Sequence, residues 1–150
     1  MRSRIAEAFA KQCLGPGDDI LVQASGLEKD SISGLPVRLM KSDFDLYVDQ
    51  TPPPTLFDVY DSGVKFDYVI TLSSGGLPVT QCDSYVNALY RPEDGLVRRS
   101  WDIKPFKGLP EDEETRIEIT LQIIQLIKDK VQDLITEIRG SHSGVSSDLH

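Results

Sequence analysis

The sequence predicts an α/β fold built on a parallel sheet, and two observations carry this prediction. Three short segments have strand character: Ile20–Gln23, Asp67–Leu72 and Leu96–Trp101. Segments with the spacing of apolar residues found in helices alternate with them along the chain, as in α/β proteins. The segment Asp67–Leu72 is rich in β-branched residues and almost continuously apolar, which is typical of a strand buried on both faces of a parallel sheet. We therefore expect an α/β sandwich.

Composition and charge exclude several classes of protein. The 150 residues favour one domain, and 39% hydrophobic with 27% charged residues indicates a globular chain rather than a disordered one. The formal net charge of −8 disfavours general binding to nucleic acid or to a membrane surface. No apolar run approaches the ~20 residues of a membrane span, and the first residues contain no apolar signal core. The two cysteines, Cys13 and Cys82, are too few for a disulfide scaffold, so we expect a soluble cytoplasmic protein.

The first part of the chain predicts a helix, a strand and a second helix. The first helix spans Ser3–Cys13, where the apolar residues Ile5, Phe9 and Cys13 recur every four positions. Gly15-Pro16-Gly17 ends it. The short apolar strand Ile20–Gln23 follows, and Leu35–Lys41 forms a short helix that tolerates Pro36 in its first turn.

The middle of the chain contains loops around two predicted strands, of which Asp67–Leu72 is the clearest in the chain. Residues Ser42–Pro54 are polar and end in three prolines, which predicts an extended loop rather than a domain boundary. Leu56–Tyr60 fits one or two helical turns. The strand Asp67–Leu72 is followed by the Gly/Ser loop Ser73–Pro78, and the strand Leu96–Trp101 by a loop that reaches Pro110.

The longest predicted element is an amphipathic helix from Glu111 to Gly140. Its apolar stripe repeats every seven residues, at Ile117, Ile124, Val131 and Ile138. Such a stripe packs on a sheet or joins a partner helix in a coiled coil; three heptads ending at a glycine favour packing on the sheet. We expect residues 1–140 to form the single domain and Ser141–His150 a flexible polar tail.

Four places suit ligand binding. In α/β sheets ligands bind at the carboxyl ends of strands, here Ala24–Gly26, Ser73–Pro78 and Asp102–Gly108. Arg2 and Ser3 precede a helix N-terminus, where free amides and a guanidinium can bind an anion; the alternative is that Arg2 is a frayed terminal residue. His142 and His150 lack a third ligand at useful spacing, so we expect no metal site and no cofactor.

Several segments, in order, resemble the low-molecular-weight protein tyrosine phosphatase and arsenate reductase superfamily. They cover roughly residues 2 to 139 and comprise Met1–Ala10, Ala24–Glu28, Leu35–Lys41, Phe66–Leu72, Ser100–Ile103 and Phe106–Gly108. The resemblance implies a parallel-sheet sandwich of the low-molecular-weight phosphatase type. It also implies cysteine-based phosphate-ester hydrolysis or arsenate reduction.

The same resemblance assigns roles at the start of the chain. In the family a Cys-x5-Arg-Ser sequence precedes the first helix, which places its arginine and serine at Arg2 and Ser3 as oxyanion-binding residues. The nucleophilic cysteine would then lie six residues before Arg2, upstream of Met1, together with the first strand and most of the phosphate loop. We therefore expect this 150-residue chain to be inactive by itself and its sheet to lack the first strand.

Two further positions depart from the family pattern. Pro105 stands where related sequences have the general-acid aspartate, so Asp102 is a catalytic candidate only if its loop shifts; otherwise it is a solvated turn residue. Ser73 and Thr80 stand where arsenate reductases have cysteines, which leaves Cys82 as a candidate resolving thiol or an ordinary small loop residue. Cys13 lies on the apolar face of the first helix, where we expect it to join the core.

Two functions follow as hypotheses. The first is an enzyme that acts on phosphate, arsenate or a phosphorylated substrate, with thioredoxin or another thiol donor as partner if it reduces arsenate. The second is a non-catalytic module of the same fold that binds an oxyanion or a protein. In either case, a chain without a central strand can pair edges with a second copy of itself as a homo-oligomer.

Overall fold

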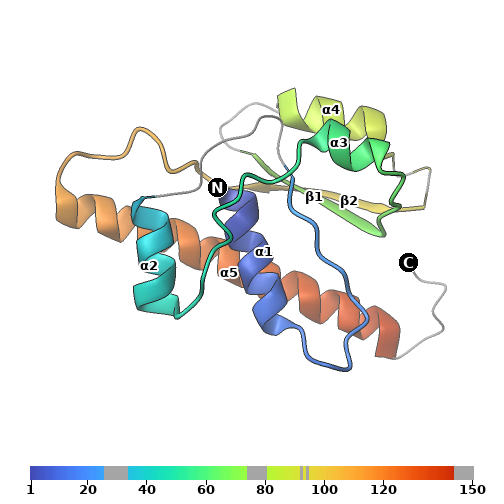
Figure 1. Cartoon of the computed structure of the whole chain (residues 1–150), viewed down its shortest axis with the longest axis horizontal. Helices are drawn as coiled ribbons and strands as arrows, with labels where there is room; N and C mark the ends of the chain where they lie inside the picture. Colours follow the sequence, from blue (N-terminus) through green and yellow to red (C-terminus); the bar gives the residue numbers. More distant parts are fainter. Residues whose placement is uncertain (26–33, 74–80, 92, 94, 144–150) are drawn as a thin grey trace.

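The computed structural model has helices on both sides of a small parallel sheet (Figure 1). It describes residues 1–25, 34–73, 81–91, 93 and 95–143. The elements are α1 (Arg2–Cys13), α2 (Leu35–Phe44), α3 (Leu56–Asp61), β1 (Tyr68–Ser73), α4 (Gln81–Leu89), β2 (Val97–Asp102) and α5 (Glu113–Ser143). No helix within these residues is long and apolar enough to cross a membrane.

The sheet of the described residues consists of β1 and β2 in parallel pairing. Tyr68 lies opposite Val97 and the register continues to Ser73 opposite Asp102. Parallel strands need a crossover connection, and α4 lies within it. Both strands lie within one residue of their predicted bounds, so the prediction of a parallel α/β sheet is confirmed.

The prediction that Ile20–Gln23 forms a strand is wrong. Residues 18–25 are described, yet they form no strand and make no backbone hydrogen bond to β1. A strand requires a partner at about 4.8 Å, and a cavity separates these residues from β1. The apolar pattern of Ile20–Gln23 therefore did not suffice to predict a strand.

Each face of the sheet carries its own apolar cluster, because neighbouring strand residues point to opposite faces. On one face, Val69 packs with Leu56 of α3 and with Val86 of α4. On the other face, Ile70 and Leu72 pack against the larger core built by α1, α2 and α5. The two strands therefore have helices packed on both of their faces, α3 and α4 on one side and α1, α2 and α5 on the other.

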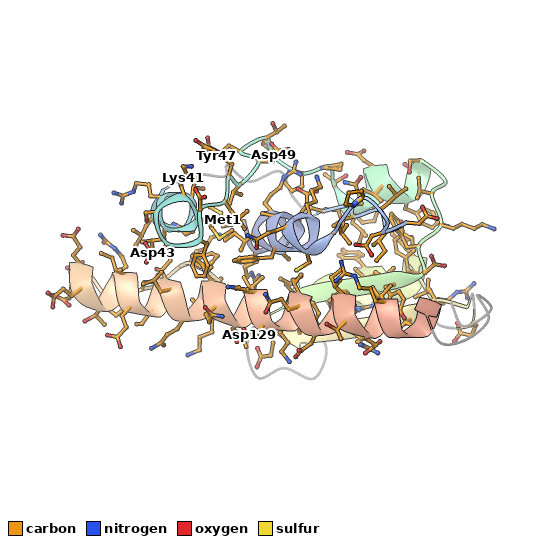
Figure 2. All side chains as sticks on the ribbon, turned by 90° about the horizontal axis from the view of Figure 1, so that it is seen from below. Met1, Lys41, Asp43, Tyr47, Asp49 and Asp129 are labelled. Carbon is orange, nitrogen blue, oxygen red and sulfur yellow. The ribbon has the colours of Figure 1, made fainter. Side chains whose placement is uncertain are left out.

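The long helix α5 runs along one side of the molecule beneath α1 and α2 (Figure 2). Its apolar stripe is buried at Ile124, Ile127, Val131, Ile135 and Ile138. The stripe is covered within the chain, as predicted, but chiefly by α1 and α2 rather than by the sheet. The helix continues to Ser143 rather than ending at Gly140, and the rest of the predicted tail lies outside the described residues.

The remaining predicted helices are present, and one helix was not predicted. α1 and α3 match the segments expected from Ser3 and Leu56, whereas α2 begins at Leu35 as predicted but continues to Phe44, into the predicted loop Ser42–Pro54. α4, which packs on β1, was not predicted from the sequence. The predicted Ser73–Pro78 loop lies outside the described residues except for Ser73, the last residue of β1.

Candidate functional site

The start of α1 has the electrostatic character of an anion site. Met1 is the N-cap and makes no side-chain capping hydrogen bond, and the first turn contains no acidic residue. It contains Arg2 and Arg4 instead. Positive side chains are repelled by the positive end of the helix dipole. An anion bound at this end would be stabilised both by the dipole and by these side chains. The local sequence therefore favours a bound anion at this helix terminus.

Arg2 is held against the loop that follows β2. Its Nη1 donates a hydrogen bond to the backbone carbonyl of Ile103, a residue 101 positions away that is fully buried. This contact places the guanidinium beside the carboxyl end of β2. Asp102 precedes Ile103 there and lies opposite Ser73 in the register of the sheet. The structure thus gathers three positions singled out in the sequence at the strand ends where α/β proteins bind ligands.

Asp102 lies at the edge of this site rather than within its core. It is the last residue of β2 and is exposed, whereas the residues on both sides of it, Trp101 and Ile103, are buried. The two buried neighbours fix the backbone, so the carboxylate projects toward solvent at the sheet edge. Pro105, two residues beyond Ile103, is half-buried in the same loop.

Arg4 has a structural role that the sequence pattern did not indicate. Its guanidinium is buried and donates to Glu7 at 2.8 Å and to the backbone carbonyl of Thr51 at 3.0 Å. Asp49 lies 3.6 Å from it. A hydrogen bond from the backbone N–H of Thr51 is the main reason that the pKa of Asp49 is lowered. These contacts attach α1 to the loop that contains Asp49 and Thr51. Arg2 and Ser3 are then the side chains of this helical turn that face the candidate site.

The cysteines lie in different elements. Cys13 and Arg2 are the last and first residues of α1, so the helical rise places their Cα atoms about 16 Å apart. Cys13 is half-buried, is a free thiol and packs against the main core, in agreement with its prediction. Cys82 lies in the first turn of α4, and its side chain is outside the described residues. A nucleophilic role beside Arg2 is therefore excluded for Cys13.

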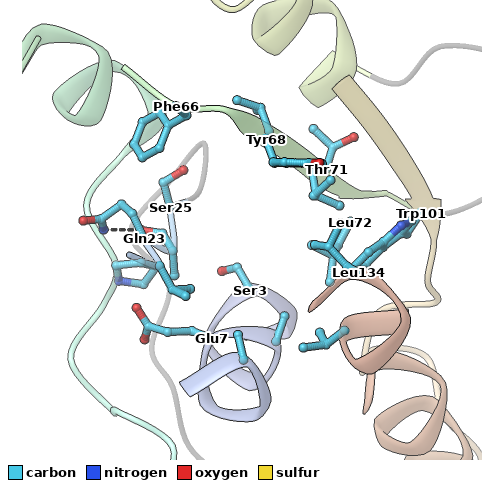
Figure 3. A pocket seen from close by; sticks show the side chains of 18 of the residues that line it. Ser3, Glu7, Gln23, Ser25, Phe66, Tyr68, Thr71, Leu72, Trp101 and Leu134 are labelled. Carbon is cyan, nitrogen blue, oxygen red and sulfur yellow. Dashed lines mark hydrogen bonds between the residues drawn. The ribbon is translucent and has the colours of Figure 1, made fainter. Parts of the chain in front are cut away.

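A cavity of about 640 Å³ adjoins the candidate site, with Arg2 and Ser3 among the residues that line it. One wall contains five consecutive residues of β1, Tyr68–Leu72, and the facing wall contains six consecutive residues, Ile20–Ser25. Figure 3 shows Gln23 and Ser25 on one side of the cavity and Thr71 and Leu72 on the other. Ser3 and Glu7 lie between these two walls, on α1. The cavity thus connects the start of α1 with the edge of the sheet.

Comparisons with known proteins establish the fold. No family model matches the chain, and no curated protein matches it in sequence. Among solved structures, the crystal structure of arsenate reductase from Archaeoglobus fulgidus DSM 4304 superimposes with a TM-score of 0.52 at 21% sequence identity. The match covers 87% of this chain and 90% of that chain. The chain therefore shares the α/β fold of that arsenate reductase.

Proposed function

We propose that the protein is a divergent member of the low-molecular-weight phosphatase and arsenate reductase superfamily, with its oxyanion site at the start of α1. The observation that supports this most is the contact of Arg2 with the loop after β2, which places a guanidinium beside the strand ends. The fold shared with an arsenate reductase is consistent with it. The substrate class is a tetrahedral oxyanion, either arsenate or a phosphate ester.

In this proposal each candidate residue has a defined role. Arg2 binds two oxygens of the oxyanion with its paired N–H groups, and Ser3 donates a hydrogen bond to the loop or to the nucleophilic thiolate. The backbone N–H groups of the first turn of α1 stabilise the charge that develops on the oxyanion. Asp102 protonates the leaving oxygen of a phosphate ester once its loop turns inward.

The nucleophile in this proposal is a cysteine thiolate six residues before Arg2, in a segment upstream of Met1. Such a thiolate is stabilised by the guanidinium and by the N-terminus of α1. In arsenate reduction it adds to arsenic with loss of water; Cys82 then attacks its sulfur, arsenite leaves with the electron pair, and a disulfide remains. Thioredoxin or another thiol donor reduces that disulfide. The 150-residue chain alone is inactive because it contains no cysteine next to Arg2.

The test is an activity measurement on the protein extended by its native upstream codons. We expect hydrolysis of an aryl phosphate or thioredoxin-coupled reduction of arsenate. Replacing Arg2 by Ala should lower kcat/KM by about 100-fold or more, the usual effect of removing one oxyanion-binding group. Arg38→Ala is the matched control, because Arg38 is exposed on α2 away from the site. A folded extended protein with neither activity would refute the proposal.

A second candidate is a non-catalytic module of the same fold that binds an oxyanion or a protein. It is favoured by Pro105, which occupies the position of the family's general acid, and by the cavity beside β1. Calorimetry of the 150-residue chain with phosphate and arsenate tests the oxyanion part. We expect binding that Arg2→Ala abolishes and Arg38→Ala preserves, and heats equal to those of dilution would contradict it.

A further inference from the structure

Three exposed aromatic side chains lie together on α3 and α4, which are neighbours on one face of the sheet (Figure 1). Phe57 and Tyr60 of α3 are 45% and 47% exposed, and Tyr85 of α4 is 42% exposed. The rings of Phe57 and Tyr85 meet edge to face, with their centroids 5.6 Å apart. These three side chains form an aromatic patch in contact with water, and contiguous apolar surface of this kind is typical of interaction sites.

The aromatic patch is separate from the cavity beside β1. Leu56 and Val59 are the residues of α3 that line the cavity, and both are buried. Phe57 and Tyr60 each follow one of them by a single position and do not line it. One position on an α-helix rotates a side chain by about 100°, so the two pairs point in different directions. A ligand of the aromatic patch is therefore not part of the proposed oxyanion site.

Asp61 adds an exposed carboxylate to this surface. It lies four positions after Phe57 and is therefore on the same face of α3. As the last residue of α3 it lies at the negative end of the helix dipole, where a carboxylate is destabilised and a cation is favoured. The last turn of α3 has no basic residue, and the ion pairs found within the described residues do not include Asp61. The end of α3 is thus a position where a cation would be stabilised.

A tyrosine ring and a carboxylate already bind a cation elsewhere in this chain. Nζ of Lys41 lies 4.3 Å from the ring centroid of Tyr47 and 3.2 Å from Oδ1 of Asp45. The carboxylate attracts the ammonium group, and the ring face adds a cation–π interaction. Tyr60 and Asp61 are the same pair of groups on α3, but the cation–π contacts found in the described part of the chain do not include Tyr60. A cation supplied from outside the chain would complete this second pair.

The charge around the aromatic patch also favours a positive ligand. Asp58, Asp61 and Asp67 are exposed, and Lys65 is the basic residue in this part of the sequence, which gives residues 55–67 a net charge of −2. The whole chain has a formal net charge of −8. Complementary charge speeds the approach of a cationic partner and repels an anionic one.

We propose that the aromatic patch and Asp61 bind an arginine-containing segment of a partner protein. The exposed rings offer a broader apolar surface than an ammonium group contacts. A guanidinium is planar, so it stacks on a ring and donates paired hydrogen bonds to a carboxylate. Arginine and tyrosine are also enriched among the residues that dominate the affinity of protein interfaces. This binding goes beyond the proposed function, because it uses none of the residues of the oxyanion site.

The test is a calorimetric titration of the 150-residue chain with a capped synthetic peptide of three Arg-Gly repeats. We expect saturable binding. A peptide with Lys in place of each Arg has the same charge and should bind at least about five-fold more weakly, because an ammonium group does not stack on a ring. Equal affinities for the two peptides, or only the heat of dilution with the Arg peptide, would overturn the proposal.

Two variants of exposed residues locate the binding. Asp61→Asn removes a charge that opposes the helix dipole, and Tyr60→Ser removes one ring of the aromatic patch, so both variants should stay folded. Each should weaken binding of the Arg peptide by about five-fold or more, as the loss of a desolvated cation–π or charged contact does. Asp45→Asn and Tyr47→Ser are the matched controls, because Lys41 already occupies that pair, and they should bind the peptide normally. Unchanged affinity in Asp61→Asn, or an equal loss in the controls, would refute the site.

Sedimentation of the free chain tests another occupant, a second copy of the same protein. We expect Asp61→Asn to leave the sedimenting mass unchanged. A dimer that Asp61→Asn dissociates would overturn the proposal of a different partner, because a second copy would then cover the aromatic patch. Oxyanion binding and its loss in Arg2→Ala do not depend on these results, so failure here is distinguishable from failure of the proposed function.

Discussion

Replacing Ile127 by Ala tests the assignment of the buried face of α5. Ile127 is fully buried in the main core, whereas its neighbour Leu126 is 40% exposed on the same helix. The substitution deletes three buried carbon atoms, and at about 0.8 kcal/mol each their transfer accounts for roughly 2.4 kcal/mol. The cavity that remains raises the expected loss to about 3–4 kcal/mol.

Urea unfolding monitored by circular dichroism measures this loss. A single domain has a free energy of unfolding of about 5–15 kcal/mol, so the variant should stay folded with its midpoint shifted at constant slope. The corresponding fall in Tm is roughly 10 °C. Leu126→Ala serves as control and should lose less than about 1 kcal/mol. Equal losses for the two variants, or a smaller loss for Ile127→Ala, would refute the orientation of α5.

Three other substitutions test named contacts. Arg4→Ala should lower the free energy of unfolding by about 3–5 kcal/mol in urea melts, because it leaves the carboxylate of Glu7 buried without its closest partner; a loss below 1 kcal/mol would contradict this. The hydrogen bond from Arg139 lowers the pKa of Asp18 to about 2. The ionised Asp18 therefore stabilises the folded state fully above pH 4–5, and this contribution is lost as the pH falls to 2. The urea-unfolding midpoint, measured from pH 5 to pH 2, should therefore change less with pH in Asp18→Asn than in the unsubstituted protein. Thr55→Ala removes the cap of α3 and should cost about 1 kcal/mol by the same melts.

Much of the fold could be predicted because its signals are local. The continuous apolar run that becomes β1 and the seven-residue repeat of α5 are patterns that few other structures satisfy. Ile20–Gln23 shows the limit of such patterns. Alternation is present, with Val22 half-buried and Leu21 exposed, but a strand exists only through pairing, and pairing depends on what lies beside it.

The candidate site could be predicted only in part, because it depends on contacts between distant residues. Arg2 and Ser3 were singled out by their place at a helix N-terminus and by a resemblance, but no local pattern indicated that Arg2 contacts Ile103 across 101 positions. Arg4 illustrates the opposite error. A charged residue in a first helical turn is usually solvated, yet this one is buried because Glu7 and the Thr51 carbonyl satisfy it.

The central claim is that the residues at the start of α1 belong to the oxyanion site of a cysteine-dependent enzyme. The most direct test is the intact mass and the N-terminal peptide of the protein isolated from its native cells. We predict a start upstream of Met1 with a cysteine six residues before Arg2. A native start at Met1 would contradict the claim, because no thiolate could then stand beside Arg2 in this arrangement.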